Sequence, residues 1–136
     1  MVGILREKLE SAAGRLCEVL LPIKHEYHIG RGKSVAICTL SSMDLLETIA
    51  WNTDMMSRIL VVGRLLSENT GISTLIRFTI NYSDLRYIVV CGKEVKGHKT
   101  GQPLLSLHKN GVNTDDSRII GAIGPYPFLT CSQTDL

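Results

Sequence analysis

The stretch that decides the fold is Ser34-Val-Ala-Ile-Cys-Thr-Leu40, and it has a counterpart in Leu85-Arg-Tyr-Ile-Val-Val-Cys91. Each is a short, nearly continuous run of apolar residues, which is typical of a strand buried on both faces of a sheet. Two more apolar runs, residues 58–62 and 118–122, are predicted to be strands of the same sheet. Four buried strands of this kind predict a mostly parallel sheet.

Segments with apolar residues at helical spacing lie before and between these strands. The predicted helices are residues 2–20, 43–52, 72–81 and 102–109. Strands that alternate with helices predict an α/β fold, here a Rossmann-like, mostly parallel sheet of about four strands with flanking helices and an extra N-terminal helix. With no linker or repeat, residues 1–136 are predicted to form a single domain.

Composition narrows the classes of function. The net charge is +2 and the basic residues are scattered, so nothing indicates nucleic-acid binding. No apolar stretch is long enough to span a bilayer, and charges interrupt the N-terminus where a signal peptide would be apolar, so we expect a cytoplasmic chain without a membrane span. The four cysteines form no CxxC pair, which argues against a zinc knuckle.

Ligands of open parallel sheets bind beyond the carboxyl ends of the strands. Segments rich in Gly, Ser, Thr, Asn or Glu follow each predicted strand, as a polar ligand would require. They are residues 39–42, 65–71, 92–102 and 121–126.

His98 is the most unusual residue in these segments, because Gly97 precedes it and Gly101 follows three residues later. The glycines leave room for a large flat ligand, and Glu94 is close enough in sequence to orient the imidazole by accepting its second N–H. A solvated or capping histidine and a phosphate-binding turn are the alternatives. Neither GxGxxG nor GxxxxGK[ST] is present, and Gly30-Arg-Gly-Lys-Ser34 precedes a strand instead of following one.

Most of this region resembles the A subunit of tetrahydromethanopterin S-methyltransferase, the sodium-pumping methyltransferase of methanogenic archaea. The matching pieces are VAICTLSS (35–42), SENTGI (67–72), LRYIVVCGKEVKGHKTGQ (85–102), LHKNG (107–111) and RIIGA (118–122). The tail Pro127-Phe-Leu-Thr130 departs from the family's pattern, and the membrane-anchoring helix that ends family members of the full complex is not expected here.

The resemblance implies a cobamide cofactor, a corrinoid of the vitamin B12 type, with His98 as the axial ligand of its cobalt. It also implies that a methyl group passes from methyl-tetrahydromethanopterin onto cobalt and then to the thiol of coenzyme M. Other subunits of the complex would carry out the transfers, and this chain would be the carrier. Another corrinoid family has the motif DxHxxG; here Lys96 stands in place of its Asp, so Glu94 is the expected partner of His98.

The residues expected at the cofactor come from the segments after the strands, and none is assigned a catalytic role. They are Thr39, Leu40, Ser41, Ser67, Glu68, Asn69, Gly92, Glu94, Gly97, His98, Thr100, Gly101 and Gln102. Three alternatives remain open: a corrinoid protein of another methyltransferase system, a nucleotide-binding Rossmann-like domain, and an assembly module without cofactor.

Overall fold

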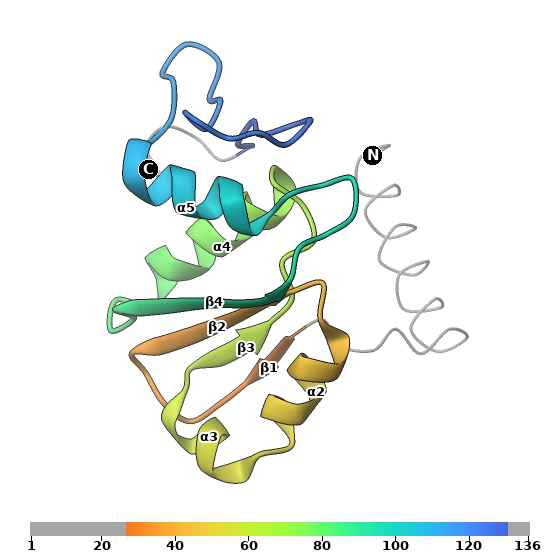
Figure 1. Ribbon diagram of the computed structural model, residues 1–136. Helices are drawn as coiled ribbons and strands as arrows, with labels where there is room; N and C mark the ends of the chain where they lie inside the picture. Colours follow the sequence, from red (N-terminus) through yellow and green to blue (C-terminus); the bar gives the residue numbers. More distant parts are fainter. Residues whose placement is uncertain (1–26, 131–136) are drawn as a thin grey trace, which may run out of the picture.

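A computed structural model describes residues 27–130 (Figure 1). The elements in chain order are β1 (Tyr27–Ile29), β2 (Val35–Leu40), α2 (Met43–Ala50), α3 (Thr53–Arg58), β3 (Val61–Gly63), α4 (Thr70–Asn81), β4 (Tyr87–Lys93) and α5 (Gly101–Asn110). The helix predicted for residues 2–20 lies outside the described residues. No helix among the described residues is long and apolar enough to cross a membrane.

The four strands form one sheet in the order β1-β3-β2-β4. Strand β2 is central and parallel to both neighbours, with Ala36 beside Val61 of β3 and Ile88 of β4, whereas β1 is antiparallel to β3. Helices α2 and α3 lie on one side of the sheet and α4 and α5 on the other (Figure 1). The α/β prediction is confirmed, and β2 is buried along nearly its whole length, as its apolar run predicts.

Residues of β2 contribute to a core on each side of the sheet. Ile37 packs with Leu46 of α2 and Val62 of β3 on one face. On the other face Leu40 packs in a cluster with Leu65 and with residues of α4 and of the chain after α5. Because the chain crosses from β2 to β3 on one face and from β3 to β4 on the other, the carboxyl end of β2 is a topological switch point, where ligands of open α/β sheets bind.

The predicted helices 43–52, 72–81 and 102–109 correspond to α2, α4 and α5 within two residues at each end. Helix α3 is not predicted. Because it extends to Arg58, the next strand is Val61–Gly63 and not residues 58–62 as expected. Asn52 begins α3 by accepting the Met55 N–H at 3.0 Å, and Arg58 near its end contacts Asp54 at 3.1 Å. A helix of six residues is too short to leave a helical period in the sequence.

The prediction that residues 118–122 form a strand of the sheet is wrong. Val112 pairs with Ile119 and Arg118 with Phe128 only in isolated antiparallel bridges. Gly121 has a φ of +82°, which turns the chain, and Ile119 and Ala122 are buried beside α4 and α5. The apolar run is therefore part of the core but not of the sheet. The composition of so short a run does not tell a buried strand from another buried segment.

The fourth strand is instead β1, from a segment that is not among the predicted strands. It has three residues, of which Tyr27 and Ile29 are exposed, so it lacks the apolar run of a central strand. The chain then passes so close to α3 that a Cβ at Gly30 would lie 2.2 Å from the Ile59 carbonyl oxygen. A glycine is required there for steric reasons, which explains part of the glycine-rich sequence without a phosphate site.

Adjacent isoleucines test the role assigned to residues 118–122. We expect Ile119→Ala to lower the free energy of unfolding by about 2–5 kcal/mol, because its side chain is fully buried. Ile120→Ala is the matched control and should change it by less than about 0.5 kcal/mol, since Ile120 is 46% exposed. Urea unfolding of both variants measures the difference, and equal effects would contradict the packing described.

Candidate functional site

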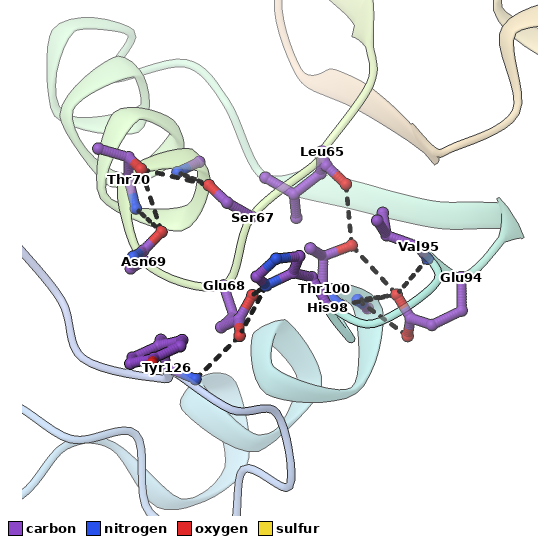
Figure 2. A network of polar contacts seen from close by, with 12 residues as sticks. Leu65, Ser67, Glu68, Asn69, Thr70, Glu94, Val95, His98, Thr100 and Tyr126 are labelled. Carbon is purple, nitrogen blue, oxygen red and sulfur yellow. Dashed lines mark hydrogen bonds and ion pairs between the residues drawn. The ribbon is translucent and has the colours of Figure 1, made fainter.

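His98 lies in the loop between β4 and α5, and Glu94 closes that loop (Figure 2). The Glu94 carboxylate accepts the backbone N–H groups of Thr100 at 2.6 Å, Gly101 at 3.0 Å and Gln102 at 3.2 Å. These donors are the first N–H groups of α5, which have no partner within the helix. The hydroxyl of Thr100, the residue before α5, makes no capping bond of its own, so Glu94 caps this helix from the start of the loop.

Burial raises the pKa of Glu94, but the hydrogen bonds from Gly101, Thr100 and Gln102 outweigh it and hold the pKa below its ordinary value of 4.5. The carboxylate is therefore ionised at neutral pH. A negative charge at the N-terminus of α5 also suits the helix dipole. Glu94 thus fastens both ends of the loop that presents His98.

Glu68 is the carboxylate that contacts His98, and it follows β3 in the chain. Its Oε2 lies 3.1 Å and its Oε1 3.3 Å from His98 Nδ1. Oε1 also accepts the backbone N–H of Tyr126 at 3.0 Å. The expectation that Glu94 orients the imidazole is therefore wrong, because its two oxygens are occupied at α5 while Glu68 reaches the ring from another strand end.

Glu68 is fully buried, with its side chain 1% exposed. Burial raises its pKa, but hydrogen bonds from its own backbone N–H, from Tyr126 and from His98 outweigh it, so its pKa lies below the ordinary range. An ionised carboxylate only accepts hydrogen bonds, so Nδ1 of His98 is the donor. In the neutral ring this leaves Nε2 with its lone pair free for a metal.

The surroundings of His98 are open. Its side chain is 49% exposed. Gly97 has a φ of +77°, and a Cβ built on it would meet nothing within 4 Å. The imidazole is thus fixed at Nδ1 by a buried group while the outer side of the loop is free of other described chain segments.

Other predicted residues hold the strand ends together. Thr100 is buried and its hydroxyl donates to the Leu65 carbonyl at 2.8 Å, which joins the loops after β3 and β4. Ser41 donates to the Lys93 carbonyl at 2.7 Å. The Thr39 hydroxyl, which is fully buried, points to the Gly63 carbonyl at 3.5 Å. These hydroxyls are hydrogen-bonded within the protein and hold the loops of the site to the strand ends.

Ser67 and Asn69, which the sequence analysis expects at the cofactor, cap α4. Ser67 Oγ accepts the Gly71 N–H at 2.8 Å, and Asn69 Oδ1 accepts the Thr70 N–H at 2.7 Å. Their side chains lie in the segment that carries Glu68 (Figure 2). The caps therefore fix the position of Glu68 at the N-terminus of α4.

Two of the predicted glycines face the protein. Gly92 has a φ of +89°, and a Cβ there would lie 2.3 Å from the Thr39 carbonyl oxygen. Gly101 is buried against Leu40 and Glu94. A groove of about 420 Å³ beside them is lined by Leu40, Glu94, Gly101 and Gln102 among others, and His98 is not part of its lining. Four of the predicted residues therefore line this neighbouring groove and not the surface around His98.

Tyr126 and Leu65 are the residues of the site that sequence reasoning missed. Both contribute backbone groups, the Tyr126 N–H to Glu68 and the Leu65 carbonyl to Thr100. A backbone contact leaves no signature in residue type. The segments that contain them, 65–71 and 121–126, are nevertheless among those expected at the carboxyl edge of the sheet.

The set of donor groups indicates which kind of metal centre fits. Among the described residues, no group of three or more His, Cys, Asp or Glu side chains could hold a metal ion. Protein-held zinc needs three or four such ligands. A single oriented imidazole instead suits a metal whose remaining ligands belong to a macrocycle, as in haem proteins. One oriented imidazole is thus compatible with a corrinoid, whose own ring would supply the other ligands of the metal.

Exchanging the Glu94 carboxylate for an amide tests the capping role. We expect Glu94→Gln to lower the free energy of unfolding at pH 7 by about 1 kcal/mol, the usual value of a helix cap. Because folding lowers the pKa of Glu94, its stabilisation is complete above pH 4.5 and is lost as pH falls through the folded value. Urea unfolding between pH 7 and pH 3 should show that the difference in the free energy of unfolding between Glu94→Gln and wild type disappears as the pH falls.

Asp115→Asn is the control, since it makes the same exchange in an exposed turn. It should leave the stability nearly unchanged at every pH. A constant difference between Glu94→Gln and wild type down to pH 3 would mean that the carboxylate charge does not stabilise α5.

Comparison with known proteins places this site in a family. Residues 18–135 match the family of the A subunit of tetrahydromethanopterin S-methyltransferase. The corresponding protein of Methanosarcina acetivorans is 37% identical over 108 residues, which are 79% of this chain and 42% of the relative. One of the A subunits of Methanothermobacter thermautotrophicus, the one numbered 2, is 46% identical over 69 residues, 51% of this chain and 38% of the relative.

A Methanosarcina barkeri protein named as the A subunit of methyltransferase Mtx is 35% identical over 118 residues, 85% of this chain and 54% of the relative. The chain thus spans about half the length, or less, of these curated relatives. The family match covers the sheet, the Glu68–His98 pair and the loop closed by Glu94. The chain therefore belongs to the family of tetrahydromethanopterin S-methyltransferase A subunits.

Proposed function

We propose that this chain binds a cobalt corrinoid and carries a methyl group on it within a methyltransferase, with His98 as the residue that would hold the cobalt. The observation that carries the proposal is the Glu68–His98 pair, in which a buried carboxylate 3.1 Å from Nδ1 leaves Nε2 free on a half-exposed ring. A bound cobalt corrinoid supplies a metal centre that accepts a methyl group and releases it to a nucleophile.

The chain's own residues have three tasks in this proposal. Glu68 keeps the proton of His98 on Nδ1 and raises the basicity of Nε2. Glu94 holds the loop in shape by capping α5. Gly97 keeps the outer surface of the loop clear, so that a wide flat ligand can approach the imidazole.

The methyl donor and acceptor are proposed from the family. Relatives are named as subunits of tetrahydromethanopterin S-methyltransferase, and we propose methyl-tetrahydromethanopterin as the donor and coenzyme M as the acceptor here. Relatives that are named as one subunit imply further subunits, which would carry out the two transfers. One relative is named for another methyltransferase, Mtx, and the alternative to this proposal is a corrinoid protein that serves a different donor and acceptor.

The nucleotide-binding alternative receives less support. A phosphate site in this fold uses free backbone N–H groups in the turn after the first parallel strand. Here the Ser41 N–H donates to the Lys93 carbonyl at 2.9 Å and the Ser42 N–H to the Thr39 carbonyl at 2.9 Å. These two donors in the turn after β2 are therefore already used within the protein and are not available to a phosphate.

A visible-absorption titration with aquacobinamide tests the proposal. This corrinoid lacks a nucleotide base that would compete with a protein histidine for cobalt. We expect the wild-type chain to bind it and to shift its bands as an added imidazole does. His98→Ala should abolish the band shift and raise the dissociation constant at least about tenfold, because the ligand to the metal is lost.

His108→Ala is the matched control, since His108 is near the end of α5 and outside the site. It should bind and shift the bands like wild type. Unchanged bands in His98→Ala would remove His98 from the metal while keeping the corrinoid. Failure of the wild-type chain to bind would reject the corrinoid function.

Glu68 variants test whether the carboxylate positions the imidazole. Glu68→Ala removes the acceptor of Nδ1, and we expect about 10–100-fold weaker cobinamide binding, as is usual when the partner of a metal-bound histidine is lost. Glu68→Gln keeps one carbonyl oxygen and should lose less affinity. Thermal melting without ligand separates this effect from unfolding. If both variants are folded and bind cobinamide with wild-type affinity, the orientation of the His98 imidazole by Glu68 does not limit binding.

A further inference from the structure

The segment Gly121–Phe128 forms a wall beside the His98 site, and two predicted site residues hold it there. Gln102 Nε2 donates to the Gly121 carbonyl at 2.9 Å, and its Oε1 accepts the Ile123 N–H at 3.1 Å. Glu68 accepts the Tyr126 N–H at 3.0 Å. A single carboxylate thus separates the His98 imidazole from the backbone of Tyr126, so the wall and the histidine have a fixed relative position.

Tyr126 is held between two prolines. Pro125 and Pro127 fix their own φ angles and restrict the residue between them to extended conformations. Pro127 is fully buried, its carbonyl accepts the Ile119 N–H at 2.8 Å, and the Phe128 N–H donates to the Tyr126 carbonyl at 2.9 Å. This backbone has little freedom even though it forms no helix or strand.

Two large side chains of this rigid wall are nevertheless exposed. Tyr126 is 63% and Ile123 is 64% exposed. Figure 2 shows the Tyr126 ring next to the Glu68 carboxylate, on the side away from Thr100 and Glu94. Single exposed apolar residues are common on protein surfaces. Here two large ones belong to one anchored segment, whose backbone is joined to the half-exposed histidine through the Glu68 carboxylate. Exposed aromatic and aliphatic side chains on a fixed segment can form a contact surface for a ligand.

We propose that Ile123 and Tyr126 form the apolar wall against which the corrinoid macrocycle packs when His98 binds its cobalt. This inference rests on the function proposed above and adds the specificity-determining residues. A corrin ring is a broad macrocycle that carries methyl groups beside its amide side chains, and a fixed aromatic ring packs on its apolar parts at little cost in conformational entropy. The wall would favour a corrinoid over a free metal ion or a small imidazole-binding ligand.

Tyr126→Ala tests the wall by aquacobinamide titration of the full chain. We expect its dissociation constant to rise about tenfold. The bands at saturation should match those of wild type, because His98 still binds the metal. Tyr126→Phe should bind as wild type does. Tyr87→Ala is the matched control, since Tyr87 is 66% exposed at the amino end of β4, away from the site, and it should have no effect.

The outcomes separate the two proposals. Wild-type affinity in Tyr126→Ala and Ile123→Ala overturns the wall while leaving the corrinoid function intact. Bands of Tyr126→Ala that match those of His98→Ala also overturn it, because the tyrosine would then act through the histidine. Ile123→Ala is the second variant if Tyr126→Ala unfolds in thermal melting. Absence of binding by wild type rejects the proposed function, and the wall with it.

Discussion

The buried carboxylate of Glu68 is the group on which the arrangement of this site depends. It accepts hydrogen bonds from the loop after β4, through His98 Nδ1, and from the segment after α5, through the Tyr126 N–H. Burying a carboxylate is costly unless it is hydrogen-bonded. The donors that satisfy it come from parts of the chain 30 and 58 residues away, so the requirement to pair one charge brings these segments together.

The second carboxylate, Glu94, has a local task. It gathers the first N–H groups of α5, which have no partner inside the helix, and so closes the loop from Glu94 to Gln102. The two carboxylates thus have different roles at one edge of the sheet. Glu94 fixes the shape of the loop, and Glu68 orients the imidazole of His98 in that loop. Exchanging their positions would satisfy neither task, because Glu94 belongs to the loop itself and Glu68 to another strand end.

Sequence reasoning predicts the parts of the fold that leave a long pattern. The apolar runs of β2 and β4 and the periodicity of α2, α4 and α5 are sufficient for the α/β class. Strand β1 and helix α3 are too short to leave a pattern, and residues 118–122 have the composition of a strand but pack against helices. The site shows the same limit. Predicted strand ends locate Glu68 and His98 at one edge, but the pairing of His98 with Glu68 instead of Glu94 depends on a contact across 30 residues.

The position of the site follows from the topology of the sheet. Strand β2 is central, its two parallel neighbours β3 and β4 end at the same edge, and the helices after β2 and β3 cover opposite faces. The loop after β2 therefore leads to one face and the loops after β3 and β4 lead to the other, where Thr100 joins these two loops through the Leu65 carbonyl. A histidine on one loop and a carboxylate on the other are held by the same strands that form the core. The imidazole consequently has a defined direction although its ring is half exposed, because its orientation is set from the buried side.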